Sequence, residues 1–245
     1  MSITTESEAL QELVEANHIL FKEGVVDAFG HVSARHPERP DHFLLARNLA
    51  PGSVASEDLI EFDLEGEPAR GDVRRPYLER FIHSEIYRTR PDVRAIVHSH
   101  SSTVVSFSLV RTFRFRPVCH MCGFLGEGAE HFDIRDLEGP ATDLLIRNRR
   151  LGQALAQSLG SSNVVLMRGH GSTVVAPSLK QAVYRAVYTE VNARILADAL
   201  RIGSVEYLSP EEASAAALTL EAQIERPWQL WKAAAQSARS GNIKA

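Results

Sequence analysis

The sequence is poor in cysteine, in long apolar runs and in excess positive charge. Only two of its 245 residues are cysteines, too few for a disulfide framework. No apolar run is long enough to span a bilayer, and the first twenty residues carry acidic side chains where a secretory signal has a basic segment and an apolar core. These absences argue against disulfide-stapled and membrane-spanning proteins, and we expect a cytoplasmic protein.

The charge balance narrows the range of partners. The chain has 27 Lys and Arg against 31 Asp and Glu, a formal net charge of -4 at pH 7, and its pI is near 6.2. It therefore lacks the broad positive surface that attracts nucleic acid or an anionic membrane. With 44% hydrophobic and 24% charged residues, we expect one globular domain over residues 1–245 that binds a small molecule, with no nucleic-acid or membrane partner.

The two cysteines stand three residues apart, as Cys119 and Cys122 in CHMC. Such a pair could be redox-active or could form half of a metal site. The sequence holds no second cysteine pair that would complete a four-thiolate site. Two reduced, partly buried thiols are therefore the simpler interpretation.

Apolar spacing predicts a mixed α/β domain. Helical spacing occurs in four segments, 7–23, 76–87, 141–159 and 177–203, the last with Ser178 as N-cap and Gly203 at its end. Short apolar segments predict strands at 42–46, 59–63, 92–100, 163–167 and 173–175. We expect a central, mostly antiparallel sheet with flanking helices.

The tail from about residue 205 is expected to be helical. A helix is predicted around 209–224, followed by an amphipathic piece that contains Trp228 and Trp231. Two tryptophans three residues apart fit ordinary packing against the core, or alternatively a lid over a neighbouring subunit's site.

The clearest chemical signal is AIVHSHSS at 95–102, with two histidines two residues apart. In a strand, alternate side chains point to the same face, so His98 and His100 project together. His170 stands between Gly169 and Gly171, which allow the sharp turn that would bring its imidazole to another group. Three such histidines match catalytic metal sites with an open coordination position, although they could also be unconnected surface or core residues.

One carboxylate could join these histidines. Glu79 shares a helix face with His83 and lies beside an apolar stripe, where burying it unpaired would cost several kcal/mol. A metal cation or an arginine would be a suitable partner. Alternatively, Glu79 is exposed and pairs with Arg75 or Arg80.

The order of these motifs resembles the class II aldolase/adducin family over roughly residues 8–225. The similarity rests on Gly-x-x-Ser at 30–33, the glutamate-bearing helix, Pro-Asp-Val-x-Ala-Ile-Val-His-Ser-His, and His-Gly before a strand and a long helix. The resemblance implies a three-layer α/β/α fold, a homotetramer with sites near subunit interfaces, and a divalent metal. It also implies metal ligands at His98, His100 and His170, and an acid/base glutamate at Glu79 that can approach the metal.

The sequence departs from the sugar-phosphate members of that family where they bind phosphate. Fuculose phosphate aldolase and ribulose phosphate epimerase use Gly-Asn-x-Ser, a Thr-x-x-Gly loop and two serines before the glutamate. Here His31 precedes Ser33 in the first motif, Arg47 stands in the second, and Tyr77 precedes the glutamate. We expect these four residues to bind substrate. Arg47 would hold a carboxylate, His31 a hydroxyl or carboxylate, and Tyr77 would pack on a flat ring.

The stretch GHVSARHPERPDHFLLARNLAP is similar to the family branch that contains metal-dependent decarboxylases of hydroxylated aromatic or pyridine dicarboxylates. We therefore predict a metal-dependent lyase that decarboxylates a small hydroxylated aromatic or heteroaromatic (di)carboxylate. Glu79, or else His31 or His83, would protonate the ring carbon. Mn²⁺ or Zn²⁺ is the expected ion, with Fe²⁺ as a third option.

Three other functions remain open. The chain could be a class II aldolase acting on an unphosphorylated hydroxy or oxo acid, because the same metal set would stabilise an enediolate. An Fe(II)-dependent aromatic oxygenase occurs in the same branch. A non-catalytic protein like adducin would not require the full set of histidines and glutamate.

Two arginines have simpler interpretations as well. Arg47 could form a structural salt bridge with Glu57 or Asp58, in the segment that follows it. Arg135, in FDIRD at 132–136, is expected to bridge to a neighbouring acid, with substrate contact as the alternative.

Overall fold

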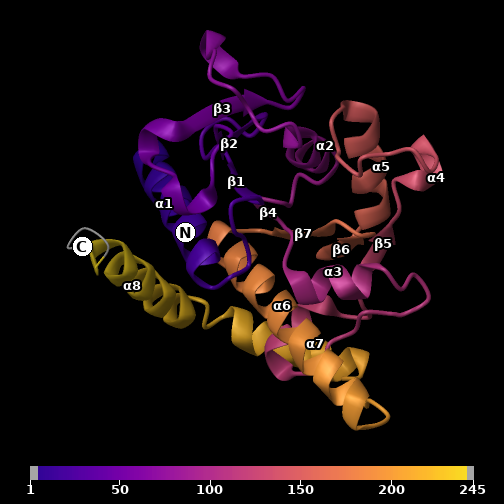
Figure 1. The fold of residues 1–245 in the computed structure, drawn as a ribbon. Coiled ribbons are helices and arrows are strands. Elements are labelled where there is room, and N and C mark those ends of the chain that lie inside the picture. Colours follow the sequence, from indigo (N-terminus) through magenta and orange to yellow (C-terminus); the bar gives the residue numbers. More distant parts are fainter. Residues whose placement is uncertain (1–4, 242–245) are drawn as a thin grey trace.

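The computed structural model describes residues 5–241, built around a seven-stranded sheet in the order β3-β2-β1-β4-β7-β6-β5 (Figure 1). Neighbouring strands are antiparallel except β5 and β6, which are parallel. The strands are β1 His31–Arg35, β2 His42–Ala46, β3 Leu59–Asp63, β4 Ala95–Ser99, β5 Glu130–Phe132, β6 Val164–Met167 and β7 Gly171–Ala176. This confirms the prediction of a central, mostly antiparallel sheet.

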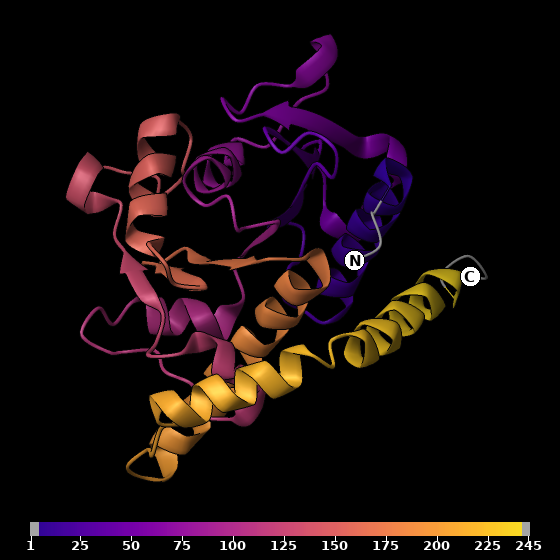
Figure 2. The ribbon, with the colours of Figure 1, turned by 180° about the vertical axis from the view of Figure 1, so that it is seen from behind.

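Helices cover both faces of the sheet in a three-layer α/β/α arrangement (Figures 1 and 2). One layer holds α1, α3 and α6, and the other holds α2 packed against α5. The helices are α1 Glu6–Lys22, α2 Arg80–Thr89, α3 Ser102–Ser108, α4 Arg135–Glu138, α5 Arg149–Leu159, α6 Leu179–Ile202, α7 Pro210–Glu221 and α8 Glu225–Gly241. None of the helices in residues 5–241 has both the length and the apolarity to cross a membrane.

The central strand β4 lies between β1 and β7 and is buried along its whole length. Its apolar residues Ile96 and Val97 are fully buried, and they face the equally buried Val174 and Val175 of β7 across the strand pair. Strands covered on both sides can be apolar at every position, which is why this segment lacks strict alternation. The end of β4 therefore emerges from the buried centre of the sheet.

The long helix and the tail follow the sequence-based expectation. The Ser178 side chain accepts a hydrogen bond from the Gln181 amide and caps α6, which ends at Gly203. After α7, the helix α8 returns along α1 (Figure 2). Trp228 and Trp231 are buried in the core of their own chain, as the packing interpretation predicts.

Two expected helices begin later than predicted. The helix expected at 76–87 begins only at Arg80, and the helix expected at 141–159 begins at Arg149. Residues 141–148 instead run without helix beside the end of β4, where their backbone groups bond to side chains described below. The Asn148 side chain then accepts a hydrogen bond from the Leu151 amide and caps the start of α5. Competing hydrogen bonds to the backbone of Leu144 and Ile146 account for the later start of α5.

Strand β1 has no counterpart in the sequence-based prediction. Its five residues HVSAR are all buried, yet three of them are polar, so the hydrophobic pattern of a strand is absent. Arg35, for example, donates to the carbonyl oxygens of Val93, Tyr87 and Arg90, which compensates for its burial.

A short 3₁₀ helix, His120–Leu125, packs against α7; Cys122 lies within it and Cys119 is its N-cap residue. Both thiols are free, with their Sγ atoms 2.9 Å apart. Cys122 is fully buried and Cys119 is partly exposed.

Candidate metal centre

Three imidazoles converge at the end of β4. The Nε2 atoms of His98 and His100 lie 2.9 Å apart, so the two side chains project together as the spacing predicts. The Nε2 atom of His170 lies 3.1 Å from that of His100. His170 reaches this position because Gly169, at φ 64°, turns the chain sharply between β6 and β7.

Glu79 completes the cluster from the start of α2. Its Oε2 atom lies 3.5 Å from the Nε2 atoms of both His98 and His170. Its Oε1 atom accepts a hydrogen bond of 2.9 Å from the Ile146 amide. Glu79 is buried, so the alternative of an exposed residue that pairs with a neighbouring arginine is wrong.

These four side chains fit a divalent metal ion. One donor atom from each of Glu79, His98, His100 and His170 lies within 4.8 Å of the others. Metal–nitrogen bonds of 2.0–2.1 Å in a tetrahedron separate the donor atoms by about 3.3 Å. The nearest donor pairs here are 2.9–3.5 Å apart, close to that spacing.

Hydrogen bonds on the far side of the rings orient the lone pairs. The Nδ1 of His170 donates to the Leu144 carbonyl oxygen at 2.9 Å, so Nε2 is the unprotonated nitrogen. The Nδ1 of His98 lies 3.4 Å from Oγ1 of Thr173. Because Thr173 donates its own proton to the Met167 sulfur, its oxygen accepts from His98. Both rings therefore direct an Nε2 lone pair into the cluster.

The charges of the cluster suit a cation. Burial lowers the pKa of His100 to about 3, helped by the neighbouring rings of His98 and His170, so this imidazole is neutral at pH 7. Burial alone raises the pKa of Glu79, but its close contacts with the His170 and His98 rings outweigh burial and hold the pKa well below its ordinary value. Neutral imidazoles around an ionised carboxylate form a ligand set for a divalent ion.

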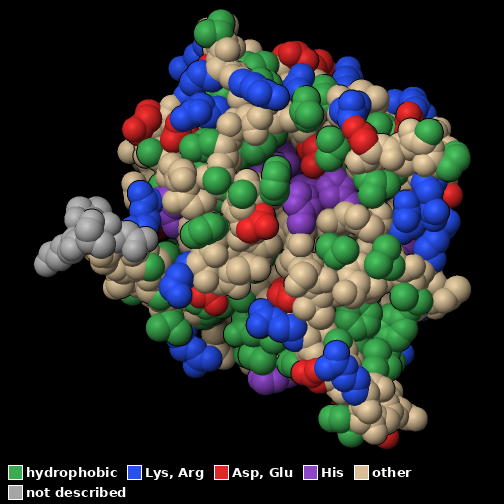
Figure 3. Space-filling model, in the orientation of Figure 1, with side chains coloured by type: hydrophobic (Ala, Val, Ile, Leu, Met, Phe, Trp, Pro, Cys, Tyr) green, Lys and Arg blue, Asp and Glu red, His purple; other side chains and the backbone are tan. Residues whose placement is uncertain are grey.

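A cavity of about 290 Å³ opens beside the cluster, near the lower limit of small-molecule sites. Histidine side chains gather in a hollow on this face of the molecule (Figure 3). Apolar side chains make up much of the wall. The residues that line it are Ala28, Phe29, Gly30, His31, Asn48, Leu49, Ala50, Tyr77, Leu78, Glu79, His100 and Leu145. A cavity of this size and lining suits a molecule with one flat ring.

Two of the four expected substrate-binding residues line this cavity. The His31 and Tyr77 rings lie 4.8 Å apart, centroid to centroid, and the Tyr77 hydroxyl donates to the Leu49 carbonyl. His31 is brought to the site by the sheet, because it pairs with His98 across β1 and β4. Burial raises the pKa of Tyr77 to about 12, so its phenol stays protonated.

The other two expected residues, Ser33 and Arg47, lie elsewhere. Ser33 is fully buried behind His31, where its hydroxyl contacts His83 and Tyr87, so it is a support rather than a cavity residue. The Arg47 Nε donates to Asp58 at 2.6 Å, the salt bridge named as its alternative. Arg47 does not line the cavity, and its Nε is directed to Asp58. The next three residues of the chain, Asn48 to Ala50, line the cavity instead.

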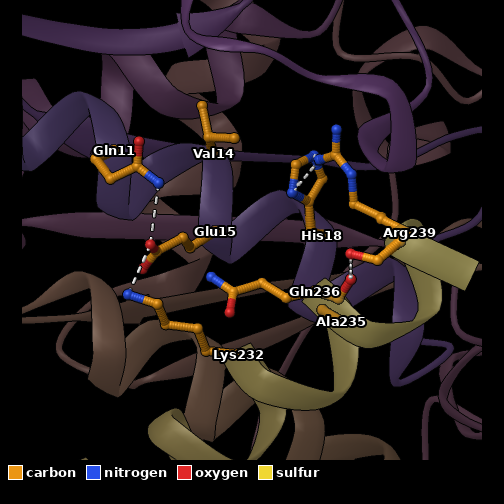
Figure 4. Close-up of a pocket in the computed structure, with 9 residues that line it drawn as sticks. Gln11, Val14, Glu15, His18, Lys232, Ala235, Gln236 and Arg239 are labelled. Carbon is orange, nitrogen blue, oxygen red and sulfur yellow. Dashed lines mark hydrogen bonds and ion pairs between the residues drawn. The ribbon is translucent and has the colours of Figure 1, made fainter. Parts of the chain in front are cut away.

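A second cavity of about 320 Å³ lies between α1 and α8 (Figure 4). In it Lys232 forms an ion pair with Glu15 at 2.8 Å, and Arg239 contacts the His18 ring. The cluster of Glu79 and the three histidines lies outside its lining. We therefore assign the chemistry to the cavity beside the histidines.

Asp133, in the segment FDIRD at 132–136, is the centre of a cluster of ion pairs separate from the histidines. Arg135 pairs with Asp133 at 2.6 Å, which confirms the bridge to a neighbouring acid. Arg168 and Arg111 approach the same buried carboxylate at 3.0 and 3.6 Å. Hydrogen bonds from Arg135 and Arg168 hold the pKa of Asp133 well below its ordinary value, although burial opposes them.

Three contributors to the site escaped sequence-based reasoning. Leu144 and Ile146 act through a carbonyl oxygen and an amide, so their side chains carry no signal. Thr173 looks like any strand threonine, and only the register of β4 against β7, which pairs it with His98, gives its role.

Comparison with known proteins agrees with this geometry. The family model described as "Class II Aldolase and Adducin N-terminal domain" matches residues 11–197. Decarboxylase tropJ of Talaromyces stipitatus is 38% identical, covering 91% of this chain and 92% of that protein. The 3,4-dihydroxyphthalate decarboxylase of Arthrobacter keyseri is 32% identical, covering 75% of each. The structure titled L-fuculose 1-phosphate aldolase from Glaciozyma antarctica superposes with a TM-score of 0.77 at 24% identity, covering 96% of this chain and 91% of that one.

Proposed function

This chain belongs to the class II aldolase and adducin family, and we propose that it is a metal-dependent lyase that decarboxylates a hydroxylated aromatic or heteroaromatic carboxylate. The observation that carries the proposal is the convergence of three imidazoles and Glu79 on the wall of a small cavity with many apolar side chains. The names of two relatives at 38% and 32% identity, both decarboxylases, support the same reaction.

His98, His100 and His170 would hold the ion, with Glu79 beside it. A divalent ion there supplies Lewis acidity, which stabilises the negative charge that loss of CO₂ leaves on the substrate. Three imidazoles suit Zn²⁺ or Fe²⁺, and the carboxylate together with an oxygen-rich substrate suits Mn²⁺. We propose Zn²⁺ or Mn²⁺ as the resident ion.

The cavity walls would bind and orient the ring. Tyr77 stays protonated and fixed through its bond to Leu49, so its ring offers a firm apolar face. Phe29 and Leu78, on the same cavity, are 69% and 50% exposed and would cover an aromatic substrate. The Arg47 Nε is bonded to Asp58, so Arg47 would bind a carboxylate with its terminal nitrogens or after release from Asp58.

Glu79 would move the proton. Its carboxylate is ionised, so it can act as a base in the resting enzyme. It would take the proton of the substrate hydroxyl next to the leaving carboxylate. The carbon–carboxylate bond then breaks, its electron pair stays on the ring, and CO₂ leaves. Glu79 returns the same proton to that ring carbon, and a proton from water restores the hydroxyl.

The test is a panel of substrates with Zn²⁺- or Mn²⁺-loaded protein. It would contain ortho-hydroxylated benzene and pyridine dicarboxylates beside unphosphorylated hydroxy-oxo acids, with products identified by mass spectrometry. We expect the loss of one CO₂, abolished by a chelator and by His170→Ala but retained in His120→Ala, a change at an exposed histidine outside the cluster. Cleavage into two carbonyl-bearing fragments would instead identify an aldolase, and oxygen consumption would identify an oxygenase.

We also propose a homotetramer with sites near subunit interfaces, located in the cytoplasm. The exposure of Phe29 and Leu78 at the cavity supports an interface there, since large apolar side chains are commonly covered in assemblies. The two free thiols suit a reducing compartment. Sedimentation velocity on the purified protein tests the assembly, and a monomer at micromolar concentration would contradict it.

A further inference from the structure

A row of four hydrogen-bonded side chains leads from the cavity into the interior of the protein. The Nδ1 atom of His31 lies 2.6 Å from Nε2 of His83, and Nδ1 of His83 lies 2.6 Å from Oγ of Ser33. Ser33 Oγ lies 2.8 Å from the Tyr87 hydroxyl. All four side chains are buried, so each proton that points into the row needs an acceptor there.

The inner end of the row fixes its direction. Within residues 5–241, the Tyr87 hydroxyl has Ser33 as its hydrogen-bond partner, so it must donate to Ser33. Ser33 then gives its own proton to Nδ1 of His83. Burial lowers the pKa of His83 to about 3, so this ring is neutral and carries its single proton on Nε2. That proton goes to Nδ1 of His31, which leaves the proton of His31 on Nε2.

The other arrangements each leave a buried proton without an acceptor. If His31 donated to His83 and the row ran inward, the Tyr87 proton would have no partner. If Ser33 accepted from both neighbours, its own proton would be unpaired. Leaving a buried donor unpaired is unfavourable, so the outward direction dominates.

We propose that Tyr87, Ser33 and His83 lock His31 in the tautomer that carries its proton on Nε2, so that the cavity presents a fixed, neutral N–H donor to a carboxylate oxygen of the substrate. His31 would contact the substrate, and the other three are positioning residues. This inference rests on the proposed function for its ligand, an aromatic carboxylate.

The location of His31 fits this role. It lines the cavity, and its ring centroid lies 4.9 Å from that of His98 because the two residues face each other across β1 and β4. Its Nδ1 is occupied by His83, so Nε2 is the nitrogen left for a ligand. A neutral donor beside a metal ion can bind an anionic oxygen without repelling the cation.

The first experiment reads the tautomer directly. Solid-state ¹⁵N spectra of Zn²⁺-loaded protein, labelled at histidine nitrogens, separate protonated from unprotonated ring nitrogens. The His31 signals are those absent from His31→Gln. We expect a proton on Nε2 of His31 in the native chain and a mixture of tautomers in His83→Phe. The matched control is His131→Phe, whose ring contacts Phe113 outside this row. A proton on Nδ1 of His31 in the native chain would overturn the proposal.

The second experiment measures calorimetric binding of ortho-phthalate, a dicarboxylate without the reacting hydroxyl, to Zn²⁺-loaded protein. His31→Leu should weaken binding by about 10-fold or more, because a hydrogen bond to a charged group contributes about 1.5–3 kcal/mol. His31→Gln, whose amide can donate from nearly the same point, should stay within about threefold. His83→Phe should weaken binding by about threefold to tenfold, and His131→Phe should not change it.

The two experiments separate this inference from the proposed reaction. If both give the expected results but no carboxylate loses CO₂, the donor role of His31 stands and the decarboxylase proposal fails. If CO₂ is released but His31→Leu binds phthalate as tightly as the native chain, the donor role fails and the reaction stands.

Discussion

Gly171 lies so close to the Ser99 carbonyl oxygen that a Cβ atom on it would be 1.9 Å away. The contact joins the first residue of β7 to the last residue of β4, between His170 and His100. No side chain fits there, so glycine at this position is a condition for the two histidines to meet.

Gly171→Ala should therefore disturb both the fold and the cluster. The methyl group must push β7 away from β4, which we expect to cost about 3 kcal/mol. Urea denaturation measures the loss, and metal titration of the folded fraction should show weaker Zn²⁺ binding. Gly203→Ala is the control, because its Cβ would meet nothing within 4 Å, and it should stay within about 0.5 kcal/mol of the native chain. Equal stability of the two variants would contradict the role of the close contact.

Thr173→Val should weaken metal binding without removing a ligand. The valine has nearly the same shape but cannot accept the Nδ1 proton of His98, which leaves that ring less firmly oriented. We expect the affinity for Zn²⁺ to fall about 10- to 100-fold in competition with a chromogenic chelator. Thr189→Val, which removes a buried hydroxyl bound to the Arg185 carbonyl, serves as control. If both variants bind Zn²⁺ equally, Thr173 does not support the cluster.

Glu79→Gln should leave the protein folded but nearly inactive. The amide oxygen can still accept the Ile146 amide proton, whereas the side chain can no longer take a proton from substrate. We expect kcat to fall by about 10²- to 10⁴-fold on the substrate identified by the panel. Glu67→Gln, at an exposed position, should keep full activity. A kcat within a few-fold of the native value would exclude Glu79 as the base.

Asp133→Asn should lower stability in a pH-dependent way. The pKa of Asp133 is below its ordinary value when folded, mainly through hydrogen bonding to Arg135, so its contribution is present above the unfolded pKa of about 3.9 and is lost as pH falls further. We expect a loss of about 1–3 kcal/mol at pH 7 in urea denaturation, shrinking below pH 4. Asp198→Asn, at an exposed carboxylate, provides the baseline. If the difference in unfolding free energy between Asp133→Asn and the native chain stays constant from pH 7 to pH 3, the ionised carboxylate of Asp133 is not its cause.

Alkylation should distinguish the two thiols. The hydrogen bond from Cys122 lowers the pKa of Cys119 to about 7, and pairing with Cys119 raises the pKa of Cys122. Iodoacetamide should modify Cys119 first, with a half-maximal rate near pH 7, as followed by peptide mass spectrometry. In Cys122→Ala the midpoint should move up towards about 8.5. Faster modification of Cys122 would overturn the assignment.

The convergence of His98, His100 and His170 could be predicted because it follows from short-range sequence patterns. A two-residue spacing within an apolar strand projects His98 and His100 together, and flanking glycines mark the turn at His170. The cavity residues were harder, since Arg47 binds Asp58 and the sequence offers no measure of which partner an arginine prefers.

The secondary structure near the site was predicted wrongly for a different reason. Propensity predicts helix over residues 141–148, but tertiary hydrogen bonds at Leu144 and Ile146 hold that backbone in another conformation. Strand β1 was missed because three of its five buried side chains are polar. Their partners, such as His83 of α2, come close to β1 only in the folded chain.

The segment 141–148 touches the cluster through its backbone, with one carbonyl oxygen on His170 and one amide on Glu79. Every amino acid except proline provides both groups, so these two contacts by themselves place little constraint on residues 144 and 146. Burial of the Ile146 side chain and the positive φ of Leu144 are the constraints on their identity. The number of residues between the two contacts is constrained instead, since one insertion would misalign both. Among relatives, this stretch should therefore keep its length even where its composition varies.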